Sequence, residues 1–139
     1  MIISESEIAL KESRIKGSFR MLLAEDDYAN AEYVKLVVRH QDIAVIHAKN
    51  GAEAIELFKN NPLVDIVLMD IKMPIMDGYE ATREIRKLNQ DVPIIALTAF
   101  ALDGDKEKAI SAGCTGYLTK PVGKDMLLSV IGSYLVRGR

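Results

Sequence analysis

Five short and mostly apolar runs, each followed by a polar or charged residue, constrain the fold of this chain more than any other feature. The runs are Met21–Ala24, Ile43–Ile46, Val64–Met69, Val92–Leu97 and Thr115–Leu118. An apolar run without alternation is typical of a strand covered on both faces, as strands are in a parallel sheet. The runs therefore predict five strands of a parallel sheet.

Segments with helical character separate these runs. They span Tyr28–His40, Gly51–Phe58, Tyr79–Leu88, Lys106–Ala112 and Asp125–Val136. Asn50 and Glu53 form an N-terminal capping pattern, and Gly113 is a typical residue for ending a helix. Strands that alternate with helices in this way predict an open α/β sheet joined by right-handed crossovers.

The length of the chain indicates the number of domains, and its net charge argues against some classes of protein. The chain has 139 residues, which predicts one domain. Residues 1–19 are polar and are interpreted as an N-terminal extension or linker, so that residues 20–139 form the domain. Lys and Arg number 18 against 20 for Asp and Glu, a net charge of −2. This balance argues against a nucleic-acid or membrane-surface binder, because either requires a basic excess.

Cysteine and histidine content also excludes some kinds of site. The single cysteine, Cys114, permits no intrachain disulfide, and the two histidines, His40 and His47, are interpreted as surface residues. A zinc site is therefore not expected. Because the sequence has no signal peptide and no apolar run of transmembrane length, we expect a soluble, cytoplasmic domain.

Polar residues follow four of the five predicted strands. They are Glu25-Asp26-Asp27, Asp70, Thr98 and Lys120. In open parallel sheets, ligands bind beyond the carboxyl ends of the strands, so we expect these side chains to meet at one edge. Each residue has an ordinary structural interpretation by itself, and for Asp27 a helix cap is favoured.

The chemistry of this set points to phosphoryl transfer. Clustered carboxylates repel one another, and a hard divalent cation such as Mg²⁺ relieves the repulsion while retaining sites for phosphate oxygens. A carboxylate beside such a metal is a nucleophile toward phosphorus. A hydroxyl and an ammonium group can then hold the oxygens of the transferred group. The hypothesis is therefore Mg²⁺-assisted phosphoryl transfer to an aspartate.

Two other classes of protein are compatible with a sheet of this kind. A phosphatase with an aspartate nucleophile after the first strand would carry Asp-x-Asp, whereas this sequence has Asp26-Asp27-Tyr28. A nucleotide carrier would need a Ser, Thr or Gly loop that binds phosphate after the first strand. The acids at this position would repel phosphate instead.

Four segments together resemble the receiver domains of two-component signalling. They are Leu22–Asp27, Leu68–Gly78, Ala96–Ala99 and Gly116–Pro121. The resemblance covers about Arg20 to Val136, and it implies a flavodoxin-like three-layer fold with strand order 2-1-3-4-5. Glu25 stands where many stand-alone members have Asp, and in this it resembles receivers fused to hybrid kinases. The stretch Thr98–Asp105 resembles either hybrid-kinase receivers or small single-domain regulators.

The resemblance implies a phosphorylated residue and a metal site. Asp70 would be the phosphoacceptor. Glu25 and Asp26 would be the acidic pair that binds Mg²⁺, with Asp26 the more direct ligand. Asp70 and the backbone carbonyl of Lys72 would complete the protein ligands.

The resemblance also implies a switch. Thr98 would move to bind the phosphoryl group, Lys120 would pair with it, and Tyr117 would be the aromatic residue that rotates in response. From the residues alone, Tyr117 is a core residue by default. The Lys120-Pro121 bond is often cis in such domains. Lys72 and Phe100, each two residues beyond a site residue, would influence how long the phosphoryl group persists.

The implied function is that of a signalling phosphoacceptor rather than an enzyme, although such a domain assists its own phosphorylation and dephosphorylation. The donor would be a phosphohistidine on a histidine kinase or a histidine phosphotransfer protein. A downstream protein would bind the surface formed by the helix at 106–112, the strand at 115–118 and the helix at 125–136. A degenerate receiver acting only as a scaffold is the remaining alternative, and the complete set of acids, Thr and Lys argues against it.

Overall fold

A five-stranded parallel sheet forms the centre of the computed structural model, which describes residues 18–99 and 104–135. Its strands are β1 (Phe19–Ala24), β2 (Ile43–Ala48), β3 (Ile66–Asp70), β4 (Ile94–Thr98) and β5 (Gly116–Thr119). They lie in the order β2-β1-β3-β4-β5, and every neighbouring pair is parallel. The predicted fold class and strand order are therefore confirmed.

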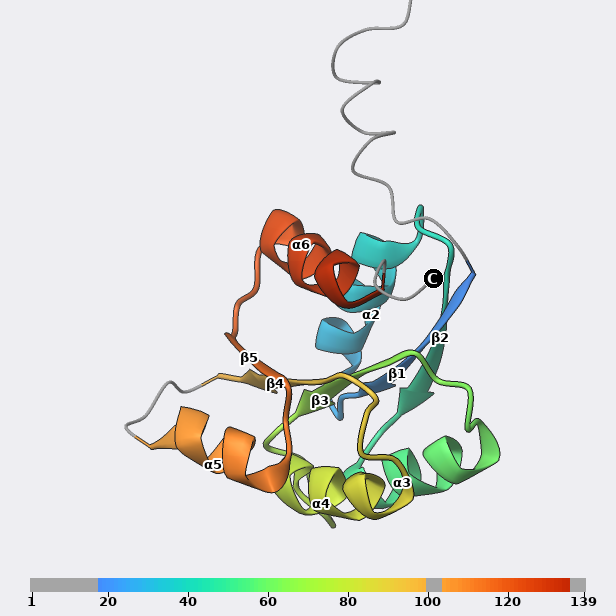
Figure 1. Cartoon of the computed structure of the whole chain (residues 1–139). Helices are drawn as coiled ribbons and strands as arrows, with labels where there is room; N and C mark the ends of the chain where they lie inside the picture. The colour runs from blue at the N-terminus through green and yellow to red at the C-terminus, as the bar shows by residue number, and fades with distance from the viewer. Residues whose placement is uncertain (1–17, 100–103, 136–139) are drawn as a thin grey trace, which may run out of the picture.

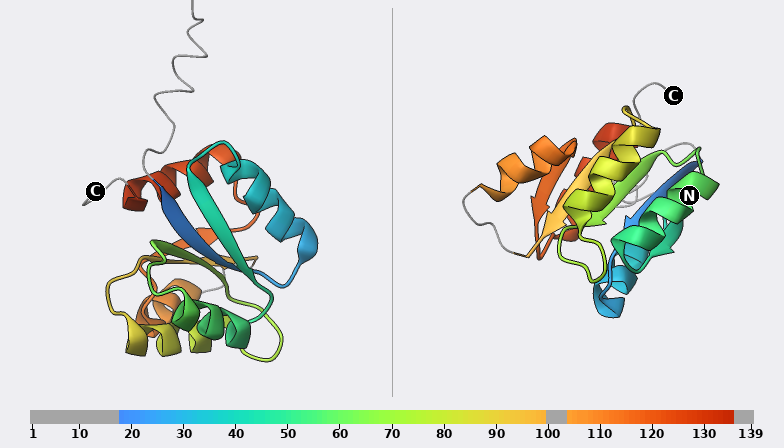
Figure 2. Two further views of the ribbon diagram at one scale, coloured as in Figure 1. Left: turned by 90° about the vertical axis from the view of Figure 1, so that its right-hand side faces the viewer. Right: turned by 90° about the horizontal axis from the view of Figure 1, so that it is seen from below.

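Helices cover both faces of this sheet (Figure 1). They are α2 (Tyr28–Val38), α3 (Gly51–Asn60), α4 (Gly78–Leu88), α5 (Asp105–Ala112) and α6 (Lys124–Leu135). Helices α2 and α6 lie on one face, and α3, α4 and α5 lie side by side on the other (Figure 2). The result is a three-layer arrangement with two hydrophobic cores, one on each side of the sheet.

The central strands are buried because both of their faces carry apolar side chains. Every residue of β3 and β4 is buried. Alternate side chains enter opposite cores: Val67 and Met69 contribute to the core under α3, α4 and α5, whereas Ile66 and Leu68 contribute to the core under α2 and α6. This two-sided burial accounts for the uninterrupted apolar runs in the sequence.

The predicted ends of several helices are confirmed by their hydrogen bonds. The Asn50 side chain accepts from the Glu53 N–H at the start of α3, and the Asp27 side chain accepts from the Asn30 N–H at the start of α2. After α5, Gly113 has a φ of 112°, a left-handed conformation that glycine adopts without steric cost.

Strand boundaries differ from the prediction by one to two residues, for identifiable reasons. The predicted strand at 92–97 begins only at Ile94, because the Val92 N–H bonds the Asn89 side chain in a turn. In contrast, β2 extends two residues further than predicted, to Ala48, because its pairing with β1 continues to the Ala24–Ala48 pair. His47 is therefore a strand residue.

The structure also bears on the expected absence of membrane-spanning helices and on the expected extension at residues 1–19. Among residues 18–99 and 104–135, no helix is long and apolar enough to cross a membrane. Most of the expected extension, residues 1–17, lies outside the described part of the chain. Phe19, the last residue of that segment, begins β1 and is buried in the core under α2 and α6.

Candidate phosphorylation and metal site

The carboxyl ends of β1, β3, β4 and β5 bring together the polar residues that follow them in sequence. Asp70 is the last residue of β3, Thr98 is the last residue of β4, and Lys120 follows β5. Glu25 and Asp26 follow β1 directly. The parallel pairing aligns these ends, since Asp70 pairs with Leu97 and Thr98 pairs with Thr119. The predicted convergence at one edge of the sheet is thus observed.

Asp70 is held at its position by the loop that follows it. The Ile71 N–H bonds the Leu97 carbonyl at 3.0 Å, and the Gly78 N–H bonds the Ile71 carbonyl at 2.9 Å. The loop returns so closely that a Cβ atom at Gly78 would lie 2.3 Å from the Asp70 carbonyl oxygen. Only glycine leaves enough space for this approach, and Asp70 itself is 5% exposed.

Three carboxylates form a cluster suited to a hard cation. One oxygen from each of Glu25, Asp26 and Asp70 lies within 4.8 Å of the others. Glu25 and Asp70 are buried, whereas Asp26 is exposed to solvent. Mg²⁺ prefers oxygen ligands and keeps several waters, so a cluster with one solvent-facing acid fits its coordination.

Lys120 places a positive charge beside two of these acids. Its Nζ lies 2.5 Å from Glu25 Oε1 and 3.4 Å from Asp70 Oδ1. The Lys120 N–H donates to the Thr98 carbonyl at 2.6 Å, which fixes the backbone of the lysine against the end of β4. The Lys120–Pro121 peptide bond is cis, as the resemblance implied.

The pKa values of the buried acids move in opposite directions. Burial raises the pKa of Asp70 to about 8, and the neighbouring Glu25 carboxylate adds to this effect. Burial also acts to raise the pKa of Glu25, but hydrogen bonds with Asp70 and Lys120 outweigh it and lower this pKa. Burial disfavours the charge on Lys120, yet its contacts with both acids raise its pKa above the ordinary value. Without a cation, Asp70 therefore carries the proton of the pair at neutral pH.

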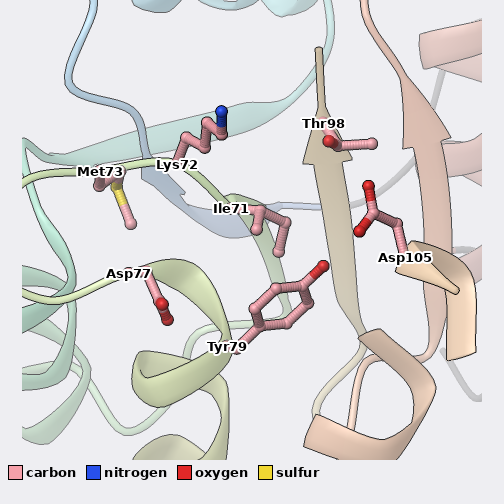
Figure 3. A pocket seen from close by; sticks show the side chains of 7 residues that line it. All are labelled: Ile71, Lys72, Met73, Asp77, Tyr79, Thr98 and Asp105. Carbon is pink, nitrogen blue, oxygen red and sulfur yellow. The ribbon is translucent and has the colours of Figure 1, made fainter. Parts of the chain in front are cut away.

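A cavity of about 490 Å³ opens beside Thr98 on the side of α4 and α5. Ile71, Tyr79 and Asp105 are among its lining residues, and Figure 3 shows the Tyr79 ring directed from α4 toward Thr98 and Asp105. Tyr117 is half-buried and packs against the core on the same side of the sheet. Of the expected switch residues, Thr98 thus lines the cavity, and Tyr117 packs on the same side of the sheet.

A second and larger hollow lies on the opposite side of the site. It has a volume of about 840 Å³ and lies between α2 and α6, with Glu25, Lys120 and Pro121 in its lining. Tyr33 of α2 also lines it, and its hydroxyl donates to the Val122 carbonyl at 2.7 Å. The hollow is therefore lined by residues of both helices and by Glu25 of the acidic cluster.

Some residues lie in positions that the sequence did not predict. His40 is exposed as expected, but His47 is half-buried, which corrects its interpretation as a surface residue. Tyr79 and Asp105 beside Thr98 were not expected at the site, because a helical pattern carries no signal for a neighbouring strand end. Lys72 is exposed, and Phe100 lies outside the described residues.

The chain is similar in sequence to proteins of two-component signalling. Residues 21–132 match the response regulator receiver domain. The chain is 36% identical over 126 residues to hybrid signal transduction histidine kinase I of Dictyostelium discoideum. This match covers 85% of the chain and 7% of the kinase, so the chain spans only a small part of that relative.

Two solved structures are similar to the whole described fold. The receiver domain of the sensor histidine kinase PA1611 from Pseudomonas aeruginosa has a magnesium ion coordinated in its active site cleft. It superposes with a TM-score of 0.79 at 35% identity, with 86% of this chain and 99% of that domain covered. The receiver domain of Saccharomyces cerevisiae Ssk1, crystallised with the histidine phosphotransfer protein Ypd1, gives a TM-score of 0.81 at 30% identity, with 88% and 92% covered.

Proposed function

Because this chain belongs to the response regulator receiver domain family of two-component signalling, we propose that it accepts a phosphoryl group on Asp70 with Mg²⁺ bound beside it. One observation carries the proposal. The buried Asp70 carboxylate lies at the end of β3, in a cluster with Glu25 and Asp26 and 3.4 Å from the Lys120 ammonium group. The proposal assigns residues 20–139 to the receiver domain, together with Phe19 as the first residue of β1, and assigns the residues before Phe19 to an extension.

The metal ligands would be the carboxylates of Glu25, Asp26 and Asp70 together with the Lys72 carbonyl. The magnesium ion in the Pseudomonas receiver supports this choice of cation. When bound, Mg²⁺ would neutralise charge on the phosphoryl oxygens. It would also favour the ionised form of Asp70, because a nearby positive charge lowers the pKa of a carboxyl group.

Asp70 is the nucleophile in this proposal. One of its carboxylate oxygens attacks the phosphorus of a phosphohistidine, and the new P–O bond forms as the P–N bond breaks. The electron pair of the P–N bond leaves with the imidazole nitrogen of the donor. Thr98 donates its hydroxyl to a phosphoryl oxygen, and the Lys120 ammonium pairs with another. Water later reverses the modification, so the chain serves as a signalling phosphoacceptor that assists its own reactions.

The assignment of Asp70 is tested by intact-mass analysis after incubation with acetyl phosphate and Mg²⁺. We expect one added phosphate, absent from Asp70→Asn. Asp77→Asn is the matched control, because Asp77 lies in the adjoining loop and caps α4, a role that asparagine can also fill. An equal yield of phosphorylated protein from Asp70→Asn would refute the assignment.

The donor would be a histidine kinase or a histidine phosphotransfer protein. The Ypd1 complex of the similar Ssk1 receiver supports this class of partner. In our proposal the donor docks at the hollow between α2 and α6, which leads to Lys120 and Glu25. Tyr33 is 41% exposed there and supplies a large contact surface.

This docking site is tested with two donors. Tyr33→Asp should slow phosphoryl transfer from a phosphorylated histidine phosphotransfer protein, because a charge replaces an aromatic contact. Phosphorylation by acetyl phosphate should be unchanged, since that donor needs no protein surface. Equal slowing with both donors, or none with either, would argue against docking at this hollow.

A further inference from the structure

The end of β2 carries a histidine that points to the side of the sheet covered by α2. Side chains alternate along a strand, so His47 shares a face with Ile43 and Val45. Both of these residues pack against the core under α2 and α6. His47 is therefore half-buried, next to the turn that connects β1 to α2.

The His47 ring makes a hydrogen bond with the backbone of this turn. Its Nε2 lies 2.8 Å from the carbonyl oxygen of Glu25. A carbonyl oxygen can only accept, so Nε2 must carry the hydrogen. The tautomer or protonation state of the ring is thereby restricted to forms that are protonated at Nε2.

This bond replaces the next backbone hydrogen bond that the pairing of β1 with β2 would make if it continued. The Glu25 N–H donates to the Ala48 carbonyl at 2.9 Å, which is the last rung beyond the paired residues. Beyond Ala48 the chain turns into α3, whose cap is Asn50. The Glu25 carbonyl therefore faces the end of the strand, and the His47 side chain supplies the donor that a longer strand would have provided.

The peptide unit concerned joins two of the three clustered acids. The Glu25 carbonyl and the Cα of Asp26 belong to one planar unit, so the direction of this carbonyl determines where the Asp26 side chain begins. The Asp27 N–H bonds Glu25 Oε2 at 3.4 Å, which restrains the same turn from the side-chain end. Asp26 is exposed and extends from a turn held at both of these points.

We propose that His47 is a positioning residue of the magnesium site, which holds the Glu25–Asp26 peptide so that both carboxylates face Asp70. This inference rests on the proposed function and adds a residue that does not itself touch the metal. Residues that orient metal ligands from outside typically change metal affinity by roughly 10- to 100-fold when they are substituted. A single backbone hydrogen bond is expected to lie at the low end of this range.

The test is isothermal titration of the full-length chain with Mg²⁺. His47→Ala should raise the Kd for Mg²⁺ about tenfold. His47→Gln should restore most of the affinity, because the glutamine amide nitrogen can reach the same carbonyl as a donor. His40→Ala is the matched control, since His40 is the other histidine, is exposed and lies in the turn after α2. Its Kd should equal that of the unmodified chain.

A further variant separates the hydrogen bond from ring packing. His47→Phe keeps an aromatic ring without the donor, so it should bind Mg²⁺ as weakly as His47→Ala even if the alanine variant is less stable. Unchanged affinity in His47→Phe, or equal weakening in His47→Gln and His47→Phe, would overturn the positioning role. If the unmodified chain itself fails to bind Mg²⁺, both this inference and the proposed function are wrong. If that chain binds Mg²⁺ and is phosphorylated while His47→Phe behaves identically, only this inference is wrong.

Discussion

Lys120 contacts both buried acids, but it lies nearer to Glu25 than to Asp70. Its Nζ lies 2.5 Å from Glu25 Oε1 and 3.4 Å from Asp70 Oδ1. Burial and the Glu25 carboxylate raise the pKa of Asp70 to about 8, whereas hydrogen bonds with Asp70 and Lys120 lower the pKa of Glu25. The sequence predicted that these three residues would meet. It could not predict which acid keeps the proton, because that depends on the burial of each carboxyl group and on small differences in distance between side chains from separate strands.

The raised pKa of Asp70 predicts how stability depends on pH without divalent ions. The folded chain binds a proton at Asp70 up to about pH 8, whereas the ordinary pKa is 3.8. The folded state therefore holds the extra proton between these values, and the stability that it provides is lost as the pH rises through this interval. Each unit of pKa shift corresponds to about 1.4 kcal/mol.

Denaturant unfolding in the presence of a chelator, between pH 5 and pH 8.5, measures this effect. The free energy of unfolding of the unmodified chain should fall with rising pH. Asp70→Asn removes the titrating group, so its profile should be flatter and its stability at pH 8.5 higher by at least about 1.4 kcal/mol. Parallel profiles for the two proteins would contradict the raised pKa.

The adjacent acids Asp26 and Asp27 are expected to have separate roles. Asp26 belongs to the carboxylate cluster, whereas the Asp27 side chain accepts from the Asn30 N–H and caps α2. Asp26→Ala should abolish Mg²⁺ binding together with phosphorylation by acetyl phosphate. Asp27→Ala should cost about 1 kcal/mol of stability and leave the Kd for Mg²⁺ nearly unchanged. A larger loss of Mg²⁺ affinity in Asp27→Ala would reverse the two assignments.

At the scale of elements, strands and helix caps could be predicted where residues close in the sequence determine them. Asn50 and Asp27 cap their helices as expected, because a cap needs only a short side chain near its own backbone. The end of β2 could not be predicted in this way. His47 interrupts the apolar run, and only the pairing with Leu23 shows that the strand continues through it.

The loop from β3 to α4 requires glycine at position 78, because the backbone of Asp70 and Ile71 passes close to it. In Gly78→Ala, the new Cβ would lie 2.3 Å from the Asp70 carbonyl oxygen and 2.9 Å from the Ile71 Cα. Backbone atoms cannot move aside as flexible side chains do, so the substitution should destabilise the chain by about 1–3 kcal/mol. It should also displace Asp70 and reduce the yield of phosphorylated protein.

Gly123→Ala provides the matched control for this effect, because no atom would lie within 4 Å of its added Cβ. Thermal unfolding and intact-mass analysis of the two variants measure stability and phosphorylation together. The control should resemble the unmodified chain in both. Equal behaviour of the two alanine variants would show that the close approach at Gly78 imposes no requirement for glycine.

At the scale of the whole molecule, the carboxyl ends of the strands lie between a hollow on one side of the sheet and a cavity on the other. The hollow between α2 and α6 reaches Lys120 and Glu25 from one side, and the cavity beside Thr98 opens toward α4 and α5 on the other. In our proposal, the donor would reach Asp70 from the side of the hollow, and the response to phosphorylation would pass to the side of the cavity. The order of strands, which the resemblance implied, is what places Asp70 between these faces.

The expected readout surface consists of α5, β5 and α6. A phosphoryl group adds negative charge and acceptor oxygens at Asp70, which should draw the Thr98 hydroxyl inward and pair with Lys120. Movement of Thr98 would enlarge the space on the α5 side of β4, where Tyr117 is half-buried against the core. Rotation of the Tyr117 ring into this space would change the surface that β5 and α5 present. A partner that binds the altered surface more tightly shifts the equilibrium by the difference in its affinities.

NMR spectra recorded with Mg²⁺, with and without beryllofluoride as a phosphoryl analogue, test this connection. We expect changes in the Tyr117 ring signals and in the amides of residues 104–112, in addition to those near Asp70. Thr98→Ala lacks the hydroxyl that the phosphoryl group would attract, so it should retain the changes near Asp70 but lose those at Tyr117 and α5. Changes confined to the surroundings of Asp70 in the unmodified chain would exclude this mechanism. Full changes in Thr98→Ala would mean that the signal reaches α5 without the threonine hydroxyl.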